Sequence, residues 1–195
     1  LADSVGYIRL SSFISKNASV EFEKALNGYK DKKGYIIDLR SNPGGLLSNA
    51  IIISDMFLNG GVIVSTVDRD GYKETMRAAR SNVTNKPIVI LINKGSASAS
   101  EIFSGAMKDN KRAVLVGENS FGKGLVQEVN KLMGGSGANI TIQKYLTPNG
   151  TDINKKGIAP DVVVELTEQD IKDKYDRQLQ KANDVLLELI NKQLM

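Results

Sequence analysis

Residues 87–92, Pro-Ile-Val-Ile-Leu-Ile, constrain the fold more than any other stretch of the sequence. A run of aliphatic, mostly β-branched side chains suits a strand that is buried on both faces, and such strands are typical of the centre of a parallel sheet. Parallel neighbours must be joined by long crossover connections, which are usually helices. The run therefore predicts an α/β fold with this strand at the middle of the sheet.

Two β-loop-α units support this prediction. In the first, residues 35–39 read as a buried strand, the turn-rich loop 40–45 follows, and an apolar helix is expected over 46–57. In the second, strand 87–92 leads through a serine-rich loop into a helix expected over 98–108. A chain of 195 residues has room for one such core and an appendage.

The appendage is expected at the C-terminus. Residues 167–195 are rich in charge, and their apolar side chains recur at helical spacing, which predicts an amphipathic helix. We therefore divide the chain into a core, residues 1–166, and a C-terminal helical extension, residues 167–195. The apolar face of the extension either packs on the core or makes the contacts of a homo-oligomer.

The composition excludes several kinds of site. The 26 Lys and Arg residues and 22 Asp and Glu residues give a net charge of +4, and both signs are spread along the chain. No basic block indicates a nucleic-acid partner. The sequence contains no cysteine and no histidine, which excludes a thiolate zinc site, a cysteine nucleophile and a Ser-His-Asp triad. We expect no cofactor and no metal ion.

Ser98 has two interpretations. Residues 98–101, Ser-Ala-Ser-Glu, fit the capping box. In this motif the serine hydroxyl accepts a hydrogen bond from the amide of the third helical residue, and the glutamate side chain accepts one from the amide of the serine. Helix starts are much commoner than catalytic serines, so capping alone would explain Ser98. A nucleophilic Ser98 would need a base other than histidine.

Lys123 also has two interpretations. Residues 117–123 match the first seven positions of the phosphate loop G-x-x-x-x-G-K-[ST], but Gly124 replaces the hydroxyl residue and a strand, not a helix, is expected next. Nucleotide binding is therefore a weak alternative. As a general base, a lysine must be held where the neutral amine is favoured, because its reference pKa is about 10.4. We expect Phe121 and Leu125 to provide apolar cover.

Ser98 and Lys123 together form a candidate Ser-Lys dyad, which needs no histidine. Gln127 follows the lysine by four residues, so in a strand both side chains project from one face, and the amide could orient the amine. Acyl transfer also needs N–H donors for the oxyanion. The candidates are the Ala99 amide at the helix N-terminus and an amide of the loop 42–45.

The motifs of this chain resemble those of the carboxy-terminal processing proteases, the tail-specific serine proteases of bacterial envelopes and plastids. The resemblance implies a Clp/crotonase-like spiral of ββα units, with Ser98 as nucleophile and Lys123 as general base. It also implies that Gln127 positions the lysine and that the amides of Gly44 and Ala99 form the oxyanion hole. The matching motifs cover almost the whole chain and are residues 6–9, 38–45, 95–102, 116–118, 121–124, 145–148 and 157–161.

The resemblance further implies a serine endopeptidase that cleaves unfolded or flexible protein tails near their C-termini. It implies an extracytoplasmic location, in the periplasm or cell envelope. Members of this family normally carry a PDZ domain before the catalytic core, so an upstream PDZ domain is expected in the full-length protein. Two alternatives share the architecture, namely a non-catalytic domain that binds apolar ligands and an acyl-CoA enzyme of the crotonase type.

Overall fold

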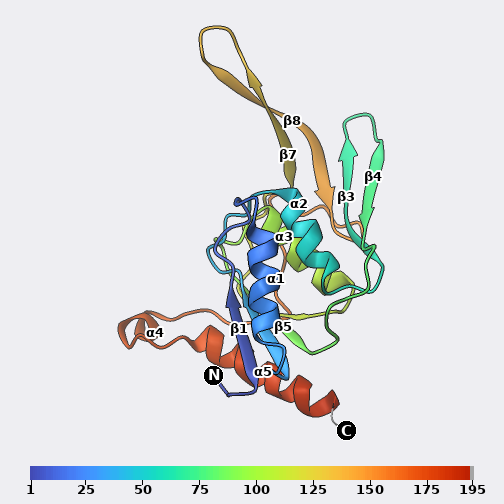
Figure 1. Cartoon of the computed structure of the whole chain (residues 1–195). Coiled ribbons are helices and arrows are strands. Elements are labelled where there is room, and N and C mark those ends of the chain that lie inside the picture. The colour runs from blue at the N-terminus through green and yellow to red at the C-terminus, as the bar shows by residue number, and fades with distance from the viewer. Residues whose placement is uncertain (194–195) are drawn as a thin grey trace.

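A computed structural model describes residues 1–193 and places a parallel sheet between two layers of helices (Figure 1). The strand order is β1-β2-β5-β6-β9, and every neighbouring pair is parallel. The strand at residues 87–92 is confirmed as β5, at the centre of this sheet, and all its residues are buried. The strands are β1 (Val5–Arg9), β2 (Gly34–Asp38), β5 (Ile88–Ile92), β6 (Val114–Gly117) and β9 (Val162–Val163).

One face of the parallel sheet is covered by the helices α1 (Ala18–Gly28), α2 (Leu47–Asp55) and α3 (Ala99–Asp109). Aromatic rings stack edge to face across this layer, with Phe57 lying 5.9 Å from Phe22 and 6.1 Å from Phe103 between ring centroids. Such pairs contribute about 0.5–1.5 kcal/mol beyond their buried area. This core fixes the position of α3, whose first turn carries Ser98.

The opposite face is covered by the C-terminal helix α5 (Arg177–Gln193). Leu186, Ala182 and Ile190 of this helix are buried against apolar side chains of the sheet, including Val89 and Val116. The continuous helix expected over residues 167–195 is wrong in one respect, because α4 (Glu168–Lys172) and α5 are separate helices. Residues 194 and 195 lie outside the described part. The division into core and extension stays a prediction.

A second, antiparallel sheet has the strand order β4-β3-β8-β7 and stands at one end of the molecule (Figure 1). Strands β3 and β4 pair antiparallel, with Ser65 opposite Thr75. The β7-β8 hairpin projects from the body as an arm (Figure 1). The strands are β3 (Val62–Asp68), β4 (Lys73–Arg77), β7 (Leu125–Lys131) and β8 (Gly137–Leu146).

The predicted fold class is confirmed, because parallel strands alternate with helices and an amphipathic helix closes the chain. Within residues 1–193, no helix is both long and apolar enough to cross a membrane.

Candidate active site

Ser98 occupies the N-cap position of α3 in a strained backbone conformation. Its φ of 54° and ψ of −114° lie outside the regions that L-residues normally adopt. Such a conformation costs about 1–3 kcal/mol and persists only where the surrounding structure imposes it. A serine on a sharp, strained turn between strand and helix is also the geometry that exposes the nucleophilic hydroxyl in α/β-hydrolases.

The contacts that impose this conformation converge on Glu101. The predicted capping box is present, and the Ser98 amide donates to Glu101 Oε2 at 2.9 Å. The same oxygen accepts the Lys123 amide at 2.8 Å, while Oε1 accepts the Gly122 amide at 2.6 Å and the Ser120 hydroxyl at 2.5 Å. One buried carboxylate therefore joins the start of α3 to the loop that carries Lys123.

This role of Glu101 was not predicted beyond the capping box. The S-x-x-E pattern indicated the local bond to Ser98, but the contacts to residues 120–123 come from a loop about 20 positions later, which no local spacing reveals. Ser120 is likewise a new participant, since its hydroxyl donates to Glu101 and accepts the Ile158 amide at 2.6 Å. The signal for Glu101 in the sequence was the local S-x-x-E pattern, and Ser120 had none.

Ser98, Lys123 and Gln127 line one cavity of about 320 Å³. The structure thus brings together three of the predicted side chains, from the start of α3, the loop between β6 and β7, and β7 itself. Its other walls are formed by Leu125, Val126, Val129, Asn139 and Tyr145. Polar and apolar side chains therefore both line this cavity.

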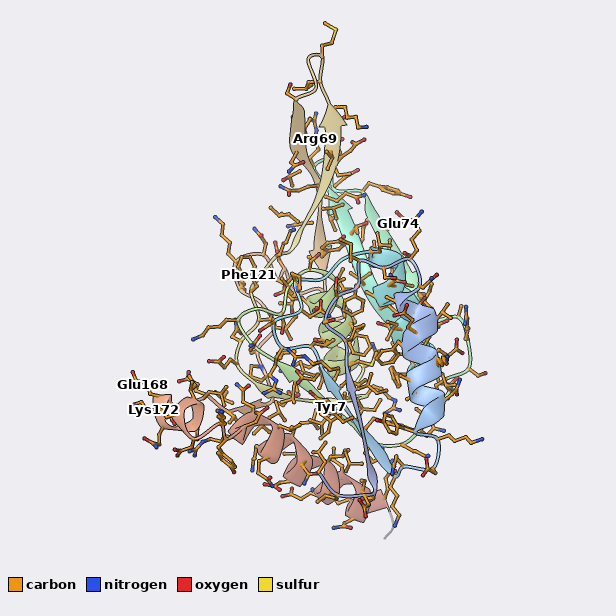
Figure 2. All side chains as sticks on the ribbon, turned by 60° about the vertical axis from the view of Figure 1, so that its left-hand side comes forward. Tyr7, Arg69, Glu74, Phe121, Glu168 and Lys172 are labelled. Carbon is orange, nitrogen blue, oxygen red and sulfur yellow. The ribbon has the colours of Figure 1, made fainter. Side chains whose placement is uncertain are left out.

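The surroundings of Lys123 differ from the prediction. Lys123 is exposed, and Phe121, which was expected to cover it, is 65% exposed and points outward (Figure 2). The loop instead packs by its backbone, with the Gly122 carbonyl accepting the Lys155 amide at 2.8 Å. Among residues 1–193, no hydrogen bond joins the Lys123 amine to the Ser98 hydroxyl or to Gln127. Catalytic hydrogen bonds are often longer in an unliganded site than in the substrate complex.

The two predicted oxyanion donors lie beside Ser98, but they are not equivalent. The Ala99 amide is the first of α3, a position without an intrahelical acceptor, and within the described chain no other group accepts it. Gly44 has a φ of +96°, and a Cβ built there would lie 2.9 Å from the Ala99 nitrogen, so only glycine fits. The Gly44 amide, however, donates to Asn42 Oδ1 at 2.9 Å. It could serve an oxyanion only after Asn42 releases it.

The nucleotide-binding alternative for residues 117–123 does not fit the structure. The strand β7 follows this loop, where a phosphate loop would be followed by a helix. The Gly122 and Lys123 amides, which would cradle a phosphate, already hold the carboxylate of Glu101. A phosphate would therefore meet a buried negative charge at this position.

A larger cavity, of about 550 Å³, lies between the end of α3 and α5 and contains none of the predicted site residues. Two of its four basic side chains, Lys108 and Arg112, are engaged by other groups. Lys108 pairs with Asp161 at 2.9 Å, and Arg112 donates to the carbonyls of Phe57, Lys86 and Thr84. These contacts join secondary-structure elements, and the described residues that line this cavity include no serine, threonine or tyrosine.

The chain matches peptidase family S41 over residues 4–164. It is 48% identical over 188 residues to the carboxyl-terminal-processing protease of Synechocystis sp., with 94% of this chain and 44% of that protein covered. It is 46% identical over 192 residues to the carboxy-terminal-processing protease of Bartonella bacilliformis, with 94% and 42% covered. The chain therefore spans less than half the length of these relatives.

Among solved structures, a photosystem II D1 C-terminal processing protease superposes with a TM-score of 0.77 and 38% identity. The superposition covers 83% of this chain and 42% of that one. A family match over most of the sequence and relatives of this identity establish that the chain belongs to peptidase family S41.

Proposed function

We propose that this chain is the catalytic core of a serine endopeptidase that uses Ser98 as nucleophile and Lys123 as general base. One observation carries the proposal most directly: Ser98, held in a strained conformation at a helix start, shares a cavity with Lys123 and Gln127. Membership of a peptidase family supports the same reaction class. The absence of histidine from the sequence makes lysine the natural base.

The reaction follows from these positions. As general base, the Lys123 amine takes the proton of the Ser98 hydroxyl as the oxygen attacks the scissile carbonyl carbon. The oxyanion forms near the Ala99 amide, and the departing amine receives the proton from Lys123, which leaves an acyl-enzyme on Ser98. Water, deprotonated by the same lysine, then hydrolyses the ester and regenerates the serine. In this scheme the amide of Gln127 orients the Lys123 amine.

We propose flexible protein tails as the substrate class. The cavity walls contributed by Val126, Val129 and Tyr145 would accept apolar side chains, and β7 is an edge strand beside which an extended segment can lie. The relatives are named as proteases that process carboxyl termini, and these names support cleavage near a C-terminus. We extend the proposal to an upstream PDZ domain in the full-length protein and to an extracytoplasmic location.

Peptide cleavage by matched serine variants tests the proposal. Ser98→Ala should abolish turnover of a flexible peptide, because it removes the attacking oxygen. Ser104→Ala is the matched control, since Ser104 lies on the same helix and its buried hydroxyl has no hydrogen-bond partner in residues 1–193. It should retain turnover.

Lys123→Arg should also be inactive while remaining folded, because a guanidinium keeps its proton. Normal turnover by Ser98→Ala or by Lys123→Arg would refute the Ser-Lys mechanism. A protein that binds peptides with measurable affinity, yet does not cleave them in any variant, would instead match the non-catalytic alternative, which no observation favours at present.

A further inference from the structure

Arg40 joins the active-site loop to the C-terminal helix. It follows β2 and begins the loop 40–45, which carries Gly44. Its Nη2 donates to Asp38 at 2.7 Å, and its Nη1 donates to Asp176 Oδ1 at 2.8 Å and to Gln178 Oε1 at 3.2 Å. The guanidinium thus bridges the carboxyl end of a central strand and the start of α5.

Both ends of this bridge are held firmly. Asp38 is 1% exposed and also accepts the hydroxyl of Tyr7 at 2.7 Å. Burial and this hydrogen bond raise the pKa of Tyr7 to about 12, so the phenol remains a donor (Tyr7 is labelled in Figure 2). On the other side, Gln178 is buried and donates to the Val164 carbonyl at 2.8 Å. The Asp176 side chain is 38% exposed, and its hydrogen bond to Arg40 is charge-assisted, which makes it stronger than a neutral one.

The loop that Arg40 begins is bonded in turn to the loop of the nucleophile. The Ser41 amide donates to Asn93 Oδ1 at 2.7 Å, and Ser41 has a strained φ of 58°. The Asn42 carbonyl accepts the Ala97 amide at 3.0 Å and the Ser100 hydroxyl at 3.0 Å. These bonds place Gly44 against Ser98, so a displacement of Arg40 would pass directly to the nucleophile and the oxyanion donors.

We propose that Asp176, on the C-terminal extension, is a positioning residue that holds the loop 40–45 in register with Ser98 through Arg40. The proposal rests on the proposed function of Ser98. It assigns a part in the active site to residues outside the core, because the extension supplies the outer partner of Arg40. Misplacement of reacting groups by about 1 Å can cost 10²-fold in rate, so a small shift of this loop would be visible in activity.

The simpler explanation is that Asp176 only stabilises the fold. It is the N-cap of α5, and its Oδ1 accepts the Leu179 amide at 2.9 Å. Asp176→Ser separates the two roles, because serine is also a good N-cap but is neutral and too short to keep the contact with Arg40. Arg177→Gln is the matched control, since it removes the 2.8 Å pair with Asp170 within the same extension without touching Arg40.

The experiment measures kcat and KM for a flexible peptide, the rate at which a fluorophosphonate labels Ser98, and the midpoint of thermal unfolding. All rates are taken well below that midpoint. Asp176→Ser should lower kcat and the labelling rate by about 10-fold or more, with KM changed by less than about 3-fold. Arg177→Gln should leave both rates within about 2-fold. Adding Arg40→Lys to Asp176→Ser should lower the rates less than the product of the single effects, because the two residues act through one contact.

Two outcomes overturn the inference in different ways. If Asp176→Ser lowers only the unfolding midpoint and leaves kcat and labelling within about 2-fold of wild type, the contact is purely structural. If the wild-type protein is neither labelled at Ser98 nor able to cleave peptides, the proposed function fails and this inference fails with it. If wild type and Asp176→Ser are labelled at the same rate, this inference fails while the proposed function stands.

Discussion

Replacing Glu101 should uncouple the nucleophile from the lysine loop. Its carboxylate is 1% exposed and accepts hydrogen bonds from the Ser98, Gly122 and Lys123 amides and from the Ser120 hydroxyl. Ser98 and Lys123 share one oxygen, so their backbone nitrogens lie within two hydrogen-bond lengths of each other. The carboxylate has no cationic partner in the described chain, and these four donors are its hydrogen-bond partners.

Glu101→Gln replaces one accepting oxygen with an NH₂ group. The less costly orientation turns the NH₂ toward Ser120, whose hydroxyl can accept a hydrogen bond, and leaves the Gly122 amide without an acceptor. Hydrogen bonds to charged groups contribute about 1.5–3 kcal/mol each, and losing the burial cost of a charge offsets part of that. We expect a loss of about 2–4 kcal/mol in the free energy of unfolding, or about 5–15 °C in Tm.

Glu101→Ala should have a larger effect on activity than Glu101→Gln. The glutamine can still hold the Ser98 and Lys123 amides on its remaining oxygen, whereas alanine releases both. We expect Glu101→Gln to retain activity within about 10-fold of wild type and Glu101→Ala to lose about 10²-fold or more in kcat.

Thermal unfolding followed by circular dichroism, together with peptide turnover, measures both effects. Glu118→Gln is the matched control, because Glu118 lies on the loop between β6 and β7 that also carries Lys123. Its carboxylate pairs with the exposed Lys94 at 3.5 Å. Such a pair contributes about 0–1 kcal/mol. The reasoning is refuted if Glu101→Ala unfolds at the wild-type temperature and turns over peptide at the wild-type rate.

Three further predictions concern Gly44, Ser104 and Asp176. Gly44→Ala should lower stability by about 2–3 kcal/mol and abolish turnover, because φ is +96° and the new Cβ would lie 2.6 Å from the Ala97 carbonyl oxygen; an unchanged Tm would contradict this. Ser104→Ala should raise the free energy of unfolding by about 1 kcal/mol in denaturant titrations, because it removes an unsatisfied buried hydroxyl. Burial by itself would raise the pKa of Asp176, but hydrogen bonds from Arg40 and the Leu179 amide lower it below its ordinary value. Its contribution to stability is therefore complete above about pH 4 and is lost as the pH falls further, so the Tm difference between wild type and Asp176→Ser should shrink between pH 6 and pH 3.

The elements that follow hydrophobic pattern were predictable from the sequence. The aliphatic run at residues 87–92 became the central strand because its composition suits burial on both faces. The helix at 98–108 was located by its capping box, which lies within four residues. The single helix over 167–195 was a wrong prediction because its periodicity continues through a break. There Lys174 adopts a φ of 52°, and Asp176 begins a new helix.

The parts of the site that depend on distant loops were not predictable in the same way. Apolar neighbours in sequence indicated that Phe121 would cover Lys123, but backbone from residues 154–157 fills the space beside that loop. Gly122 and Gly124 permit this approach, since a Cβ at either position would lie within 3.0 Å of that backbone. The engagement of the Gly44 amide by Asn42 is likewise a property of the folded loop. Residue spacing indicates which groups share a site, but not which partner each one holds.

Covalent labelling of the purified protein tests the central claim most directly. A serine-reactive fluorophosphonate, from which the attacking oxygen displaces fluoride, is added and the adduct is located by mass spectrometry. We predict one adduct on Ser98, none in Ser98→Ala, and labelling slowed by about 10²-fold or more in Lys123→Arg, because the base no longer takes the proton. An adduct on another residue, or labelling of Lys123→Arg at the wild-type rate, would contradict the assignment of Ser98 and Lys123 as nucleophile and base.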